Sequence, residues 1–163
     1  EVLEIMIFTS QPRLPLLESS HARAYRAIAA RLRGNETLRR VVRTWVDWDV
    51  AAEPIEITES TCPHVTLTPA PLASEWAGEG RHRADLAIEI TLHTAGHSVI
   101  DVLNLWDAVR FALFVAQFDQ ESTGIIQRTM TQPAARFRRL PDGSRGWSAV
   151  GQIRLTMYQS NYA

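Results

Sequence analysis

Two histidines, His93 and His97, lie four positions apart in the stretch HTAGH. On a helix this spacing places both imidazoles on one face, as in zinc peptidases of the H-E-x-x-H type. Those peptidases have a catalytic glutamate after the first histidine, but Thr94 stands at that position here, and Gly96 would interrupt a helix. Whether the pair can hold a metal therefore depends on the elements that position it.

The residues around HTAGH predict a corner between a strand and a helix. Before it, apolar residues at 86, 88, 90 and 92 alternate with polar or small ones, which is the period of a half-buried strand. After it, Ser98 and Asp101 have the spacing of a capping box, so a helix is expected to begin directly after His97. A strand end and a residue before a helix cap do not share helical geometry. We therefore expect no metal at His93 and His97 and interpret both as solvated loop residues.

Other signatures of catalysis are missing from the sequence. It contains no Gly-rich phosphate loop, no G-x-S-x-G elbow, no CxxC pair and no carboxylate dyad at a recognisable spacing. The single cysteine, Cys62, precedes Pro63 and has no identifiable partner, so we expect a buried or idle thiol. The sequence predicts no catalytic residue, no metal and no cofactor, although catalytic groups can converge from distant positions.

Length and composition are those of a soluble globular protein. With 163 residues, 45% of them hydrophobic and 21% charged, the chain is expected to form a single domain over residues 1–163. Residues 1–17 are expected to form an extended N-terminal segment. No apolar run is long enough to cross a bilayer, and the opening EVLEIMIF has acids where a secretory signal has bases. We expect no membrane association.

Charge is distributed unevenly along the chain. The formal net charge is −1, yet residues 13–43 hold eight Arg against Glu18 and Glu36, and all 17 basic residues are Arg. Such a basic segment could form a nucleic-acid face. These arginines, however, fall at several angles around the predicted helices and are not interleaved with aromatic residues. A solvated helix face or an oligomer contact is the favoured interpretation.

The hydrophobic pattern predicts an α+β fold, with a mostly antiparallel sheet and two main helices packed on one face. Tryptophans on both faces of the strand at 42–48 suggest that a neighbouring subunit covers one face. The aromatic residues of the second helix, including Phe111 and Phe114, are expected in the core. The expected elements are a helix over 17–34, strands over 42–48 and 64–68, a short strand at 55–57, an exposed loop over 69–80, a strand over 82–93, a helix over 98–118, and a hairpin of 124–131 and 147–159 around a turn at 140–146.

Two groups of residues are candidates for binding a partner. Trp76 is a large apolar residue in the loop PAPLASEWAGEG, where it either anchors a contact or folds back onto its own domain. Arg81 and Arg83 follow that loop. The other group lies near the tip of the hairpin, where a phosphate or carboxylate could meet it if the tip is not simply solvated: Arg136, Arg138 and Arg139.

Five segments together resemble the tail terminator, or tail completion, proteins of long-tailed bacteriophages. They are HARAYRAIAARL, CPHVTL, RADLAIEITLHT, VIDVLNLWDAVRFALF and AVGQIRLTMYQ. The resemblance covers roughly residues 20 to 160 and lies in the order of the elements and their apolar pattern. The segment before residue 18 and the stretch 49–63 depart from the family's pattern, which leaves the exact neck component open.

The resemblance implies a structural role in the virion. Family members form a hexameric ring on the last ring of the tail tube, stop its growth and present a surface to the head. The implied partners are further copies of the chain, the tail tube protein and the head-tail connector protein, with genomic DNA passing through the ring without sequence-specific binding. The protein would be assembled in the host cytoplasm and reside in the neck. The family offers no catalytic residues to carry over.

Two other classes of function stay open. A ligand-binding or enzymatic domain would have polar groups converging on a pocket under the 98–118 helix. A nucleic-acid-binding module would use the arginines of 13–43 and 136–139 and would bind with salt-sensitive affinity. Another neck or connector component is the alternative nearest to the tail terminator.

Overall fold

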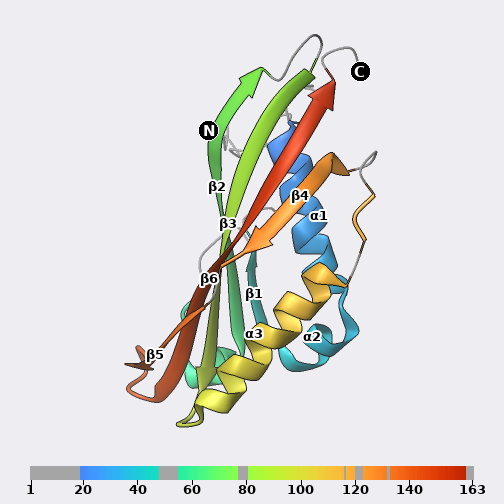
Figure 1. The fold of residues 1–163 in the computed structure, drawn as a ribbon. Helices are drawn as coiled ribbons and strands as arrows, with labels where there is room; N and C mark the ends of the chain where they lie inside the picture. Colours follow the sequence, from blue (N-terminus) through green and yellow to red (C-terminus); the bar gives the residue numbers. More distant parts are fainter. Residues whose placement is uncertain are drawn as a thin grey trace, which may run out of the picture.

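Three long strands form the spine of the molecule in the computed structural model: β2 (His64–Trp76), β3 (Arg81–Ala95) and β6 (Arg145–Ser160) (Figure 1). The structure describes residues 19–47, 55–76, 81–115, 117–119, 123–131 and 133–160, without the side chains of 71–76, 81–82 and 158–160. The predicted N-terminal segment 1–17 lies outside the described residues.

The sheet has six strands in the order β1-β2-β3-β6-β4, and β5 also pairs with β6. Short β1 (Thr44–Asp47) is parallel to β2, and all other pairs are antiparallel. Strands β4 (Ile125–Met130) and β5 (Ala134–Arg139) pair with successive parts of β6, so the predicted hairpin arm is divided in two near Pro133. The sheet is therefore mostly antiparallel, as predicted.

The helices pack on one face of the sheet, which confirms the α+β class (Figure 1). In α1 (Ser20–Gly34), the Ser19 hydroxyl accepts a hydrogen bond from the amide of Ala22 at 3.0 Å. Asn35 ends α1 and in the same way caps the short helix α2 (Glu36–Val41). The third helix is α3 (Val99–Phe114). These caps satisfy backbone amides that helix starts leave unpaired.

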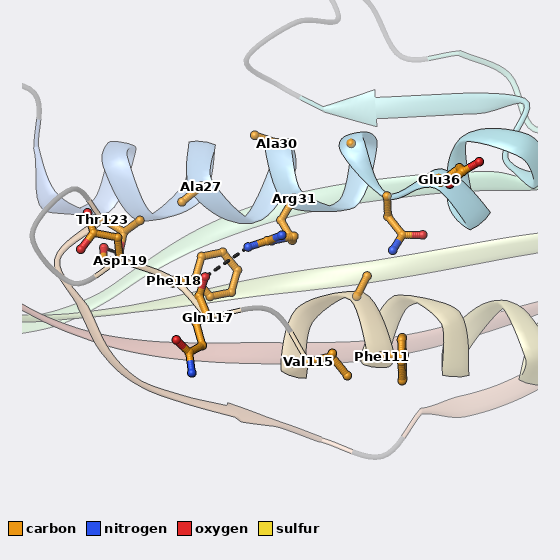
Figure 2. Close-up of a pocket in the computed structure, with 13 residues that line it drawn as sticks. Ala27, Ala30, Arg31, Glu36, Phe111, Val115, Gln117, Phe118, Asp119 and Thr123 are labelled. Carbon is orange, nitrogen blue, oxygen red and sulfur yellow. Dashed lines mark hydrogen bonds between the residues drawn. The ribbon is translucent and has the colours of Figure 1, made fainter.

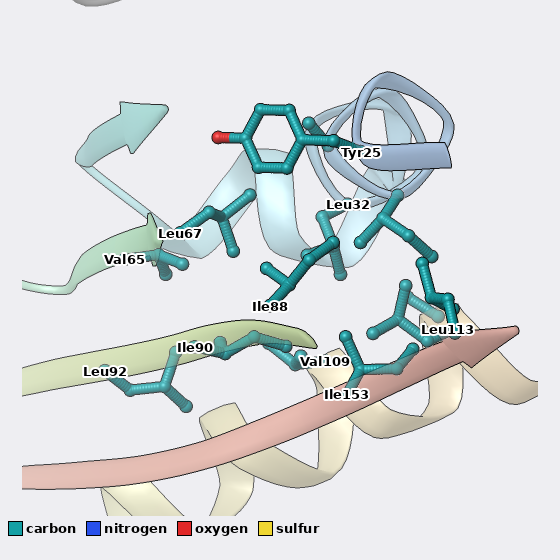
Figure 3. Close-up of a cluster of buried hydrophobic side chains, with 14 of the residues drawn as sticks. Tyr25, Leu32, Val65, Leu67, Ile88, Ile90, Leu92, Val109, Leu113 and Ile153 are labelled. Atoms are coloured by element: carbon teal, nitrogen blue, oxygen red, sulfur yellow. The ribbon is translucent and has the colours of Figure 1, made fainter. Parts of the chain in front are cut away.

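The core lies between this face of the sheet and helices α1 and α3 (Figure 3). Alternate residues of β3 point into it, because side chains alternate along a strand. They meet Ile28 and Leu32 from α1 and Val109 and Leu113 from α3. Trp106 of α3 packs directly over the backbone of Gly151 in β6, where a Cβ atom would come within 2.0 Å of the ring. The β3 residues concerned are Leu86, Ile88, Ile90 and Leu92, all essentially inaccessible to solvent.

The predicted exposed loop over 69–80 is wrong, because residues 69–76 continue β2. The prediction relied on Pro69 and Pro71, which cannot donate to a sheet hydrogen bond. Within the described residues, β1 pairs only with His64–Leu67, so from residue 68 onward β2 has a free side. The two prolines are two positions apart, so their nitrogens point to the same side of β2. A strand tolerates proline when that side is the free edge. Residues 77–80 lie outside the described part.

Smaller differences concern strand and helix ends. Residues 55–58 have no regular structure, so the short strand predicted at 55–57 is wrong. The strand predicted over 42–48 is observed over Thr44–Asp47, and Trp48 lies outside the described residues. Helix α3 ends at Phe114 rather than at 118, and Ser98 stands at its N-cap without a side-chain hydrogen bond, so the predicted capping box does not form.

Candidate assembly surfaces

The HTAGH stretch is a packing corner in which the two histidines have different surroundings. His97 is exposed, as predicted, and its carbonyl oxygen accepts a hydrogen bond from Trp147 Nε1 at 2.9 Å. Phe137 of β5 lies between the two rings, 5.7 Å from His97 and 5.3 Å from Trp147 by centroids. Through these contacts, the HTAGH stretch holds β5 against the start of α3.

The prediction that His93 is solvated is wrong. His93 lies inside β3 on the face turned away from the helices, between His64 of β2 and Ser148 of β6. The two imidazole rings meet edge to face at 5.8 Å. Burial, and then the positive charges that His64 and Arg138 can carry, lower the pKa of His93 to about 4. Burial also lowers the pKa of His64.

This histidine pair lacks a third metal ligand in the part of the chain that the structure describes. There, no group of three or more His, Cys, Asp and Glu side chains is placed to hold a metal ion. Cys62 is buried, as predicted, and burial raises the pKa of its thiol, which favours the unreactive protonated form.

The candidate arginines lie at opposite ends of the sheet. Arg83 is opposite position 158 of β6, whereas Arg138 is opposite Gly146, twelve positions away. At the rise of a strand, this separation is about 40 Å. Trp76 and Arg81 belong to the same end as Arg83 by strand register, but their side chains lie outside the described part. The predicted partner-binding residues therefore form two separate groups.

The hairpin-tip group is exposed as predicted. Arg136, Arg138 and Arg139 all belong to β5, which ends in a turn closed by Asp142. Asp142 accepts hydrogen bonds from the amide and hydroxyl of Ser144 and from the amide of Glu59 at 2.9 Å. These bonds, that of the Ser144 hydroxyl first, lower the pKa of Asp142. A hydrogen bond thereby links the turn next to the arginine group to the segment that precedes β2.

Two arginines enclose an aromatic ring beyond the end of α3. The guanidinium carbons of Arg31 and Arg128 lie 5.4 and 5.1 Å from the centre of the Phe118 ring. Arg31 donates to the carbonyl of Gln117, and Arg128 donates to the carbonyl of Phe114, both at 3.1 Å. Cations are favourable at a helix C-terminus, where carbonyl groups lack partners. These contacts tie α1 and β4 to the end of α3.

A groove of about 760 Å³ runs between α1 and the C-terminal half of α3 (Figure 2). Small residues of α1, among them Ala27 and Ala30, form one wall, and Arg31 reaches across it toward Gln117 (Figure 2). The groove is open, and charged residues of both signs line it: Arg31, Glu36 and Asp119.

A second hollow of about 550 Å³ lies beneath α3, between that helix, α2 and the start of β2. Its lining is mainly apolar and includes Leu38, Leu105 and Cys62. Thr94 lies at its wall, 2% exposed, and the buried hydroxyl has no hydrogen-bond partner among the described residues. Arg43, Glu59 and Asp101 also line this hollow, so it is a pocket beside α3 with polar groups, the kind of pocket that the ligand-binding alternative requires.

The outer side of α3 carries large exposed apolar residues beside the polar residues Asn104, Asp107 and Arg110, and the sequence prediction missed the apolar ones. Phe111 and Phe114 were expected in the core but are 65% and 41% exposed, and Ile100, Leu103 and Val115 are 57%, 39% and 63% exposed. The buried residues Val102, Leu105, Trp106, Val109, Ala112 and Leu113 already fill the inner side. The available signal was that this helix has more large apolar residues than one buried face requires.

Comparison with known proteins identifies no family. No protein-family model matches the chain, and a search of curated proteins returns no match. Among the described helices, none has both the length and the apolar character needed to cross a bilayer.

Proposed function

We propose that this protein is a structural component of the neck of a tailed bacteriophage, a tail terminator that forms a ring on the end of the tail tube. The resemblance to that family supports the proposal. Also in its favour, the five segments carrying the resemblance contribute α1, the start of β2, β3, α3 and β6, which together form the core and the spine of the sheet. The ring would be built from further copies, with the tail tube protein below and the head-tail connector above.

The observation that carries the proposal is a three-stranded arm. The carbonyl of Asp85 lies 3.1 Å from His21 at the start of α1, and β3 extends four residues further, to Arg81. Strands β2 and β6 accompany it beyond the first turn of α1 (Figure 1). The arm, defined as residues 75–76, 81–83 and 158–160, ends about 13 Å past that point. Such a projection is suited to reaching the next subunit of a ring or the tube below it.

The direct test is electron microscopy of the purified protein alone and mixed with tail tubes. The proposal expects closed rings that sit on tube ends and stop further tube growth. If the protein forms no rings at high concentration and also caps no tubes, the proposal is contradicted. Salt-sensitive binding to DNA without any effect on tubes would instead favour the nucleic-acid-binding alternative.

The arm can be tested separately through Trp76, the last residue of β2. Trp76→Ala is expected to weaken association with the ring or tube by about 2 kcal/mol or more, because aromatic anchors dominate many interfaces. Thermal unfolding of the variant should stay close to that of the parent. Trp147→Ala is the matched control: Trp147 packs against the core, so its loss should lower the melting temperature while the protein that remains folded still caps tubes. If Trp76→Ala lowers the melting temperature strongly and capping is normal, Trp76 is not the anchor.

A further inference from the structure

The outer side of α3 carries a stripe with symmetric spacing. Its members are Ile100, Leu103, Asp107, Phe111 and Phe114, all exposed. At 3.6 residues per turn these positions lie within an arc of less than a quarter turn on either side of Asp107. Their separations are three, four, four and three residues, so the stripe has the same spacing when it is followed in the opposite direction from Asp107.

Two features indicate that this stripe is covered in the functional protein. Helix α3 has more large apolar residues than its inner side buries, and contiguous exposed apolar patches mark interaction sites. Elsewhere on the described surface, large exposed apolar residues occur singly, one each in α2, the segment before β2, β4 and β5: Val41, Ile55, Ile126 and Phe137. Of the described surfaces, the one that best complements the stripe is therefore the same stripe on another copy.

We propose that a second copy of this chain covers α3, with the two α3 helices antiparallel about a two-fold axis at Asp107. In this arrangement residue 107 faces its own copy, Leu103 faces Phe111 of the second copy, and Ile100 faces Phe114. Each aliphatic side chain meets an aromatic one, so both ends of the contact are filled by unlike, complementary shapes. A two-fold contact of this kind uses the same patch on both copies.

The charges at the centre of the stripe fit this arrangement. Asp107 pairs with Arg110 one turn away in the same helix, at 3.4 Å, and both side chains are exposed. Across an antiparallel contact, the second copy brings the same pair in reverse order. The two carboxylates at the axis are then accompanied by two guanidiniums, and charges of opposite sign balance in the middle of the apolar contact. A parallel contact would instead place Phe111 and Phe114 beside their own copies.

This contact goes beyond the proposed ring. Neighbours in a closed ring of more than two subunits meet head to tail, through two different surfaces, whereas the α3 contact joins identical surfaces. The α3 contact therefore pairs two subunits through a surface that the ring contact does not use. Whether it forms can be tested independently of tube capping.

Cross-linking tests the arrangement. In a Cys62→Ala background, Asp107→Cys should form covalent dimers on mild oxidation or with a short bismaleimide, because position 107 faces itself. Ile100→Cys is the matched control, since fourteen residues of helix separate positions 100 and 114 and place the two introduced cysteines about 21 Å apart. A mixture of Leu103→Cys and Phe111→Cys chains should cross-link between unlike chains more readily than between like ones. Equal or stronger cross-linking of Ile100→Cys would overturn the antiparallel geometry.

Solution mass, measured by light scattering after size exclusion, tests whether the pair forms without a cross-link. The unmodified chain is expected to become dimeric with rising concentration, and Phe111→Glu should raise the dissociation constant about tenfold or more, because it places a charge in the apolar contact. Ile126→Glu, at an isolated exposed position on β4, should leave it unchanged. Circular dichroism and thermal unfolding check that both variants fold. A protein that stays monomeric up to millimolar concentration, with no Asp107→Cys dimer, would overturn the proposal even if it caps tubes.

Discussion

At the scale of single residues, two buried histidines link the stability of the fold to pH. His93 and His64 face each other inside the sheet, and the surroundings hold the pKa of His93 at about 4, below its ordinary value of 6.5. The sequence indicated a strand running into His93 but not its burial. That burial comes from His64 and Ser148, which lie far away in the chain and are brought together only by strand register.

The low pKa predicts that acid destabilises the protein. Between pH 6.5 and 4 the unfolded chain binds a proton at His93 that the folded chain does not, so stability is full above pH 6.5 and falls as the pH is lowered. For His93 the loss reaches at most about 3 kcal/mol. Urea unfolding at pH 7, 5.5 and 4.5 measures it. His93→Gln should flatten this dependence, and an unchanged pH profile in that variant would show that other groups cause it.

A single glycine sets how closely α3 approaches the sheet. Gly151→Ala would place a Cβ atom 2.0 Å from Trp106 Cη2, so the ring and its helix must move. We expect a loss of about 1–3 kcal/mol in unfolding free energy, as for other overpacked cores. Gly34→Ala is the control, because nothing lies within 4 Å of the added carbon and alanine is a better helix former than glycine. A Gly151→Ala variant as stable as the parent would mean that Trp106 repacks without cost.

Among the elements, β2 shows why sequence patterns identify strands less reliably than helices. The helix expected over 17–34 is observed as Ser20–Gly34, because helix signals in a sequence are local. Residues 69–76 were assigned to a loop because they contain two prolines. A strand tolerates proline where no neighbouring strand pairs with that side, and the sequence does not show which side is paired. Here, within the described residues, β1 pairs only with His64–Leu67. The same limit applies to the outer side of α3, since its apolar residues suit a core and a contact surface equally.

Beyond Leu67 one side of β2 has no partner strand among the described residues, and the two prolines are expected to keep that edge from pairing with other chains. Replacing both, Pro69→Thr and Pro71→Thr, restores two backbone donors on that edge and removes a common safeguard against edge-to-edge aggregation. Static light scattering at high concentration should show faster aggregation of the folded variant. Proline at Thr66 or Thr68 is not a suitable control, because it would disturb the pairing of β2 with β3. Thr129→Val on β4 keeps a strand-forming residue and should leave aggregation unchanged. Equal aggregation of parent and double variant would contradict a protective role.

For the whole molecule, the sequence was sufficient for the class and the order of elements but not for how surfaces combine. Alternating and helical periods predicted the α+β arrangement, because each period belongs to one kind of element. The candidate contact residues were chosen by residue type, and type says nothing about distance. Arg83 and Arg138 are consequently about 40 Å apart on one sheet. The α3 stripe could be recognised only once the inner side of that helix was seen to be filled.

The central place of β6 also has a consequence for the order in which the protein can fold as it is synthesised. β6 follows every other element in the chain, yet β3, β4 and β5 all pair with it. A ribosome that has released everything up to residue 144 has therefore exposed one side of β3 and left β4 and β5 with no partner strand. The helices and the β1-β2-β3 part can form early, but the sheet becomes complete in one late step. Until then the growing chain presents open strand edges, and chaperone binding is expected to concentrate in that interval.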